Sequence, residues 1–236
     1  MDAKTETLIP AIQLAKANPA RVPHESAEYR AARTALLAEE IELRRHVEKV
    51  AAMRRALPPG APVEGDYRFM GEAGESDLAG LFGQHETLVV YNYMYGPERA
   101  RPCPMCTDLL DAWNAIAPGL AQHLSLAIVT RSPIERLSAL KLERGWKHLR
   151  VYEDLNWTFT RDYVGIPADP ADEGAGTNVF TRRGGEIRHF WANEMWLETV
   201  DPGQDPRGAP DPSPLWGVLD MTPAGRPADW YPKLSY

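Results

Sequence analysis

Residues Thr87–Thr107 read TLVVYNYMYGPERARPCPMCT and lead from an apolar run to the only two cysteines of the chain. The first eight residues are mostly apolar, β-branched or aromatic, which is typical of a buried central strand. Gly96-Pro97 then signals a turn. A helical spacing of apolar residues begins at the cysteines and continues to about Ile116. The sequence therefore predicts a strand, a turn and a helix, with Cys103-Pro-Met-Cys106 at the junction.

This position gives the two thiols different chemistry. Unpaired backbone N–H groups and the positive end of the helix dipole favour a thiolate at a helix N-terminus. Pro104 suits the first helical position, where its missing N–H is not needed. We expect Cys103 to be the exposed nucleophile and Cys106 to be the shielded thiol that resolves the mixed disulfide. Pro104 and Met105 lie between them and should tune the reduction potential.

Several neighbouring residues are candidate supports, each with a simpler alternative. Arg99 and Arg101 lie just upstream and either lower the pKa of the first thiol or point to water. Asp108 and Asp111 either relay a proton to the second thiol or lie on the exposed face of the helix. Tyr95 should emerge near the site, with aromatic packing as the simpler account.

Two other roles for the cysteine pair stay open. A zinc site needs two more ligands, but the sequence has no second cysteine pair and no histidine pair at ligand spacing. No bound metal or cofactor is therefore expected. Alternatively, both thiols are small buried apolar groups, although their place at a helix start argues against it.

Composition limits the class of protein. The 236 residues are 44% hydrophobic and 25% charged, which indicates a folded chain. A net charge of −7 provides no basic field for nucleic acid. No apolar run approaches the ~20 residues that cross a bilayer, and the first ten residues do not form a signal peptide. We therefore expect a soluble, cytoplasmic protein with neither membranes nor nucleic acids as partners.

The N-terminal quarter differs in character from the rest. Residues 1–25 contain three prolines and little periodicity, and are predicted to be an extended arm. Residues 26–60 are predicted to be a long amphipathic helix that Ser26 caps and Pro58-Pro59-Gly60 ends. Its apolar stripe should pack on the body of the protein or on a second copy, so a homodimer through this helix is expected.

Residues 61–236 are predicted to form one α/β domain with a C-terminal extension. Its further predicted elements are a strand at 67–70, a helical turn at 78–82, a strand at 124–130, a helix at 133–144, a short strand at 149–151, a helical or irregular segment at 157–163, and a hairpin at 177–191 that turns at Gly184-Gly185.

The combination resembles family 899 of the domains of unknown function, a group of thioredoxin-like proteins. The matching segments are Tyr91–Pro97, Pro102–Thr107, Ala31–Leu37, Arg54–Pro58, Tyr67–Phe69, Asp77–Phe82, Val179–Gly185 and Leu219–Arg226. The resemblance covers roughly residues 22–236. It implies a three-layer α/β/α sandwich with a mixed central sheet and an added long N-terminal helix. It also implies dithiol–disulfide oxidoreductase activity, but not the identity of the substrate. For a dithiol of this kind we expect a thiol or disulfide of a protein or small molecule as the partner.

The chain departs from better-known proteins of that fold at two places. Thioredoxins place a cis-proline opposite the dithiol, but Gly176-Thr177 stands in that stretch, and Pro167 and Pro170 lie too far upstream. Peroxidases of this fold need Thr or Ser three residues before the reactive cysteine, where this chain has Ala100. A peroxidase role is weakened accordingly. The alternative from another class is a binding or dimerisation module in which the thiols are incidental.

Overall fold

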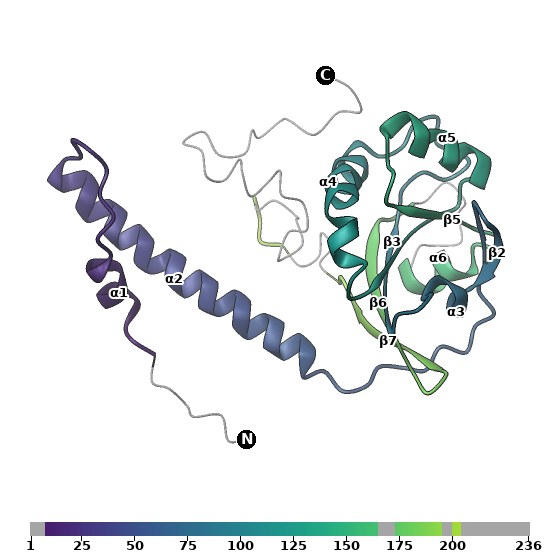
Figure 1. Cartoon of the computed structure of the whole chain (residues 1–236), viewed down its shortest axis with the longest axis horizontal. Helices are drawn as coiled ribbons and strands as arrows, with labels where there is room; N and C mark the ends of the chain where they lie inside the picture. The colour runs from purple at the N-terminus through teal and green to yellow at the C-terminus, as the bar shows by residue number, and fades with distance from the viewer. Residues whose placement is uncertain (1–7, 165–172, 195–199, 204–236) are drawn as a thin grey trace. The chain divides into compact units, whose positions relative to one another are not determined.

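The computed structural model describes residues 8–164, 173–194 and 200–203, and the chain divides into two compact units at Leu57/Pro58. The helices are α1 (Ala11–Ala17), α2 (Ala27–Arg55), α3 (Leu78–Leu81), α4 (Pro104–Leu120), α5 (Ile134–Arg144) and α6 (Thr158–Val164) (Figure 1). The strands are β1 (Arg68–Gly71), β2 (Gly74–Asp77), β3 (Thr87–Asn92), β4 (Ser125–Thr130), β5 (Arg150–Asp154), β6 (Gly176–Arg183) and β7 (Glu186–Ala192).

The first unit is dominated by α2, a helix of 29 residues. The hydroxyl of Ser26 accepts a hydrogen bond from the Tyr29 N–H at 3.1 Å, so Ser26 is the N-cap that the sequence predicts. The helix ends at Arg55, before Pro58 and Pro59 can interrupt its hydrogen bonds. The predicted long helix is confirmed.

The predicted extended arm is wrong over Ala11–Ala17, which form α1. Ala11 and Ala15 pack against Ala38 and Ile41 of α2 in a small apolar cluster. Contact with α2 supplies the stability that so short a helix lacks alone. No helix in the described parts of the chain is long and apolar enough to cross a membrane.

Within the described residues, the second unit contains one seven-stranded sheet in the order β2-β1-β5-β4-β3-β6-β7. β3, β4 and β5 run parallel, joined by crossovers that contain α4 and α5, whereas the other neighbours pair antiparallel. The sheet is therefore mixed. β3, which leads to the cysteines, lies in its interior between β4 and β6.

Helices cover both faces of this sheet (Figure 1). On one face, Leu110 of α4 and Leu137 of α5 pack with Ile128 in a large core. On the other, Leu81 and Phe159 belong to a second core around the opposite faces of β3 and β4. The result is the three-layer, thioredoxin-like α/β/α sandwich that the sequence predicts, with the long helix α2 as the N-terminal addition.

The hairpin of β6 and β7 also forms as predicted. Gly184 and Gly185 at its turn have φ of 57° and 87°, a conformation that side chains other than glycine rarely adopt. Strand β2 was not predicted. It pairs antiparallel with β1 at the edge of the sheet.

Residues 61–63, which precede β1, run along the outer edge of β7. Val63 N–H donates to the carbonyl of Ile187 at 2.9 Å, and His189 N–H donates to the carbonyl of Ala61 at 3.0 Å. Gly60 is required here because a Cβ would lie 1.6 Å from the His189 carbonyl oxygen. This contact covers the backbone of the last strand.

Candidate active site

The cysteine pair lies at the start of α4, after the loop that follows β3. Cys103 is the N-cap residue of α4, with φ −62° and ψ 123°, and Pro104 is the first helical residue. The Cys103 N–H donates to the Met94 carbonyl at 3.0 Å, and the Cys103 carbonyl accepts from Thr107 N–H at 3.0 Å. The first thiol is therefore held at a helix N-terminus, as the sequence predicts.

The two sulfurs differ in their access to solvent. Cys103 is half-buried, whereas Cys106, one turn into the helix, is 4% exposed and belongs to the core beneath α4. Both are free thiols. Pro104 is half-buried and Met105 is exposed, so the peptide between the cysteines faces outward.

The surroundings of Cys103 stabilise its thiolate. Its pKa is lowered to about 6, first by a hydrogen bond from the Cys106 thiol and then by backbone hydrogen bonds from Cys106 and Met105. The charge of Arg99 contributes in the same direction, and burial opposes all of them. A large part of Cys103 is therefore the reactive species near neutral pH.

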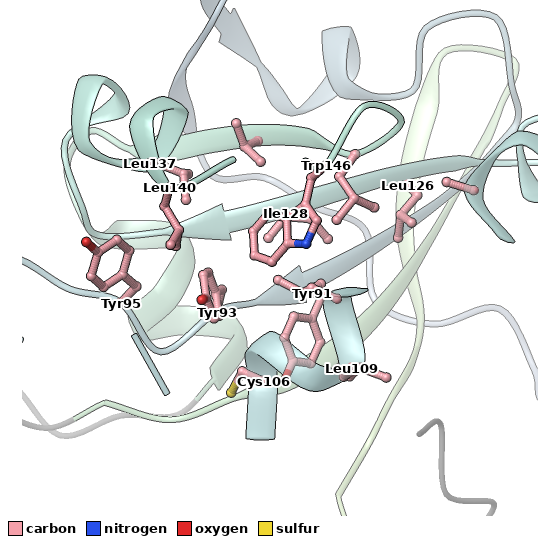
Figure 2. Packing of buried hydrophobic residues seen from close by; sticks show 14 of the residues in the cluster. Tyr91, Tyr93, Tyr95, Cys106, Leu109, Leu126, Ile128, Leu137, Leu140 and Trp146 are labelled. Atoms are coloured by element: carbon pink, nitrogen blue, oxygen red, sulfur yellow. The ribbon is translucent and has the colours of Figure 1, made fainter. Parts of the chain in front are cut away.

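The pKa of the second thiol, Cys106, is shifted in the opposite direction. Its hydrogen bond to Cys103, together with burial and the nearby Cys103 charge, raises the pKa of Cys106. A hydrogen bond with Tyr91 acts in the other direction. Burial raises the pKa of Tyr91 itself, so its hydroxyl is protonated and donates to the sulfur. Figure 2 shows Tyr91 beside Cys106 in the packed core.

A second tyrosine supports the start of α4. The hydroxyls of Tyr93 and Thr107 lie 2.7 Å apart, and Thr107 Oγ1 donates to the Cys103 carbonyl at 2.8 Å. Thr107 has one hydroxyl proton, so Tyr93 must be the donor in their shared bond. This buried chain fixes the backbone of the first cysteine.

Arg136 of α5 holds the loop that precedes Cys103, and sequence analysis missed it. Its guanidinium donates to the carbonyls of Gly96 at 3.1 Å and Ala100 at 3.3 Å, and also to that of Arg99. The same group lies 4.1 Å above the ring of Tyr95. Tyr95 is thus buried under an arginine and supports the loop from below.

The two predicted arginines have different surroundings. Arg99 forms an ion pair with Glu173, a buried carboxylate that also lies 3.7 Å from Arg131. Glu173 therefore keeps the Arg99 side chain beside the site and offsets part of its charge. Arg101 is exposed, and the largest contributions to the lowered pKa of Cys103 come from other groups.

The two aspartates that the sequence offers as proton relays also have different surroundings. Asp111 accepts from Trp146 Nε1 at 2.6 Å and pairs with Arg144, so it joins α4 to the end of α5. It is a structural residue. Asp108 is half-buried on α4, and a proton relay through it stays a prediction.

Thr177 lies next to the site on the neighbouring strand. It is the β6 residue directly opposite Tyr91 of β3, and opposite residues of an antiparallel pair place their side chains on the same face of a sheet. Thr177 thus lies on the same face of the sheet as Tyr91, which packs with Cys106 of α4. Pro167 and Pro170 lie outside the described residues.

A metal-binding role would need a group of ligand side chains in the described part of the chain. No group of three or more His, Cys, Asp or Glu side chains lies close enough there to hold an ion. The thiols have each other and Tyr91 as partners instead.

A family model described as "Bacterial protein of unknown function (DUF899)" matches residues 19–236. The chain belongs to the DUF899 family. No curated protein matches this DUF899 chain.

Solved structures similar to the DUF899 chain include a mutant of PrxQ from Xylella fastidiosa, at 14% identity and a TM-score of 0.46, over 58% of this chain and 84% of that one. Another is reduced Prx3 from Vibrio vulnificus in complex with hydrogen peroxide, at 14% identity and a TM-score of 0.44, over 61% and 92%. Peroxidoxin BcpB from Mycobacterium tuberculosis matches at 15% identity and a TM-score of 0.41, over 53% and 79%.

Proposed function

We propose that this protein is a thiol–disulfide oxidoreductase that cycles Cys103 and Cys106 between dithiol and disulfide. The observation that carries the proposal is the contrast between the two sulfurs. One is accessible at a helix N-terminus with a pKa lowered to about 6, and the other is 4% exposed directly behind it. If the two cysteines were only small apolar packing residues, neither an accessible thiol of lowered pKa nor a buried thiol directly behind it would be required.

The first step is attack by the Cys103 thiolate on a substrate disulfide. One substrate sulfur becomes bonded to Cys103, the substrate S–S bond breaks, and the other substrate sulfur leaves as a thiolate that takes a proton from water. Backbone N–H groups of Met105 and Cys106 hold the negative charge of Cys103 before the attack.

The second step is attack by Cys106 on the Cys103 sulfur. Once Cys103 is in a mixed disulfide it is neutral, so its hydrogen bond with the Cys106 thiol is weakened and its charge is gone, and both had raised the pKa of Cys106. The hydrogen bond from Tyr91 then favours the Cys106 thiolate. The Cys103–Cys106 bond forms and the substrate leaves as its second thiol. A thiol reductant must return the pair to the dithiol. Such a reductant pool is found in the cytoplasm, where we therefore place the protein.

The substrate is a disulfide of a protein or of a small molecule. A Thr177 in place of proline beside the dithiol argues against general reduction of extended protein disulfides. Peroxide is a second possible oxidant for this fold, but Ala100 is an exposed residue without a hydroxyl to hold it. Peroxide reduction is therefore not proposed.

The mixed disulfide provides the test. The protein would be incubated with an aromatic disulfide such as 5,5′-dithiobis(2-nitrobenzoate), and products would be weighed by intact-mass spectrometry. We expect Cys106→Ser to retain one substrate thiol per chain, the wild type to release both, and Cys103→Ser to react much more slowly than either.

Each single-cysteine variant is the matched control for the other, because each keeps one thiol of the pair in the same fold. Equal labelling of Cys103→Ser and Cys106→Ser would contradict the assigned order of attack. Failure of the wild type to form a reversible Cys103–Cys106 disulfide in a glutathione titration would contradict the activity itself. Rapid oxidation by hydrogen peroxide, with slow reaction towards disulfides, would favour a peroxidase.

A further inference from the structure

Helix α2 carries an apolar stripe that is largely exposed in the described part of the chain. Tyr29, Leu36, Leu43 and Val50 of α2 follow one another at intervals of seven residues, and Leu57, just beyond the end of the helix, continues the series. Leu36 and Leu43 are 53% and 63% exposed, and Tyr29 and Leu57 are also exposed. A seven-residue repeat of apolar side chains is the pattern with which helices pack side by side.

The contact with α1 uses another side of the helix. Ala38 and Ile41 are the α2 residues buried against α1, with Leu37 beside them. Leu36 and Leu43 instead line an open hollow together with Leu8 and several charged side chains of α2. The described part of the first unit therefore leaves most of the stripe open to solvent.

The charges of α2 are distributed unevenly along its length. Its first half, residues 27–42, carries four glutamates and two arginines, and its second half, residues 43–55, carries five basic residues and one glutamate. Two parallel copies would place like halves together. Two antiparallel copies would place the acidic half of each beside the basic half of the other, which electrostatics favours.

We propose that α2 pairs with α2 of a second copy of this chain, antiparallel and centred on Leu43. In this register Leu43 meets the partner's Leu43, and Leu36 meets the partner's Val50. Tyr29 comes level with the residues that follow the end of the partner's α2, where Leu57 lies. The three central positions of the stripe then have apolar partners. Glu39 and His46, which flank Leu43 on one side of the helix, come opposite each other across the pair. The pairing does not depend on the activity proposed for the cysteines.

Engineered cysteines in the full-length chain test both the partner and its orientation. With Cys103→Ser and Cys106→Ser as background, Leu43→Cys should form a disulfide-linked dimer nearly completely under mild oxidation. The matched control is Ala52→Cys, which is exposed and lies two and a half turns along α2, on its opposite side. It should remain largely unlinked.

Orientation follows from two further variants. Leu36→Cys alone should not cross-link, because 14 residues of helix separate it by ~21 Å from the partner's Leu36. A mixture of Leu36→Cys and Val50→Cys should link into heterodimers. Efficient linkage of Leu36→Cys to itself would show parallel pairing and overturn the proposal.

Light scattering on the unmodified sequence gives an independent readout. We expect twice the 26.3 kDa chain mass for the wild type and a twofold lower mass for Leu43→Glu, with unchanged circular dichroism because Leu43 is exposed. A wild type that stays monomeric at tens of micromolar, with no linkage through Leu43→Cys, would overturn the proposal and indicate that the chain's own residues cover the stripe.

Discussion

The unit that begins at Pro58 buries apolar side chains on both faces of its sheet, whereas the unit that ends at Leu57 leaves several on the surface of α2. Leu110 of α4 is completely buried, and Leu36 of α2 is 53% exposed. The same residue type therefore contributes to stability in one unit and is available for association in the other. Under the two proposals above, chemistry belongs to the second unit and assembly to the first.

The sharpest contrast should come from the same substitution in each unit. Leu110→Ala removes a fully buried side chain, and we expect a loss of ~2–5 kcal/mol in the free energy of unfolding. Leu36→Ala, at an exposed position, should change the unfolding free energy of the monomeric chain by less than ~0.5 kcal/mol. Urea denaturation at low protein concentration measures both. Similar losses for the two variants would mean that the stripe on α2 is buried within the monomer.

The pH dependence of alkylation should distinguish Cys103 from an ordinary cysteine. Because the pKa of Cys103 is lowered to about 6, its thiolate population falls as the pH drops through that value and is nearly complete above pH 7. At pH 7 it should exceed that of an unperturbed cysteine about thirtyfold. Iodoacetamide labelling followed by peptide mapping gives the profile.

Removing the second thiol sharpens that measurement. Cys106→Ala deletes the leading hydrogen bond to the Cys103 thiolate, so the midpoint of the labelling profile should move to higher pH. A midpoint that stays unchanged would show that the backbone N–H groups and Arg99 alone set the pKa.

Arg136 connects α5 to the loop before the active-site cysteine, and its loss should affect both stability and reactivity. Arg136→Ala leaves the carbonyls of Gly96 and Ala100 without this donor, at a cost of ~1.5 kcal/mol. We also expect faster hydrogen exchange in the loop and an altered labelling rate at Cys103. The control is Arg101→Ala, since Arg101 is exposed. Equal effects of the two would contradict a positioning role for Arg136.

The smallest effect is expected at the partly exposed ion pair of α4. Asp111→Asn keeps an oxygen to accept from Trp146 but removes the charge that pairs with Arg144. Exposed pairs of this kind contribute ~1 kcal/mol or less, so the thermal midpoint should fall by only a few degrees. A larger fall would indicate that Asp111 is essential for joining α4 to α5.

Local signals account for what could be predicted from the sequence. Ser26 caps α2, Gly184-Gly185 turns the hairpin, and the apolar runs of β3 and β4 lie in the interior of the sheet. Each depends on neighbouring residues alone. The place of Cys103 at a helix N-terminus follows from the same kind of local order.

Features that depend on distant parts of the chain could not be predicted. Strand β2 reads Gly-Glu-Ser-Asp and has no apolar alternation, so only its pairing with β1 makes it a strand. Arg136 contacts carbonyls 36 to 40 residues away, and Glu173 meets Arg99 from a segment that lies far along the sequence. Nothing in the local sequence of either residue indicates its partner. The local sequence of α1 does not indicate a helix, because contact with α2 is what stabilises it.

Both outer strands of the sheet are protected from joining a strand of another molecule. The β7 side is already occupied, since Ala61 and Val63 bond to its backbone. The β2 side offers four residues, two of them acidic, which repel another copy of themselves. The described sheet therefore lacks a long, apolar free edge on which a cross-β fibre could begin. The proposed exchange reaction forms transient covalent bonds with other molecules, and it would benefit from a surface that resists coaggregation with them.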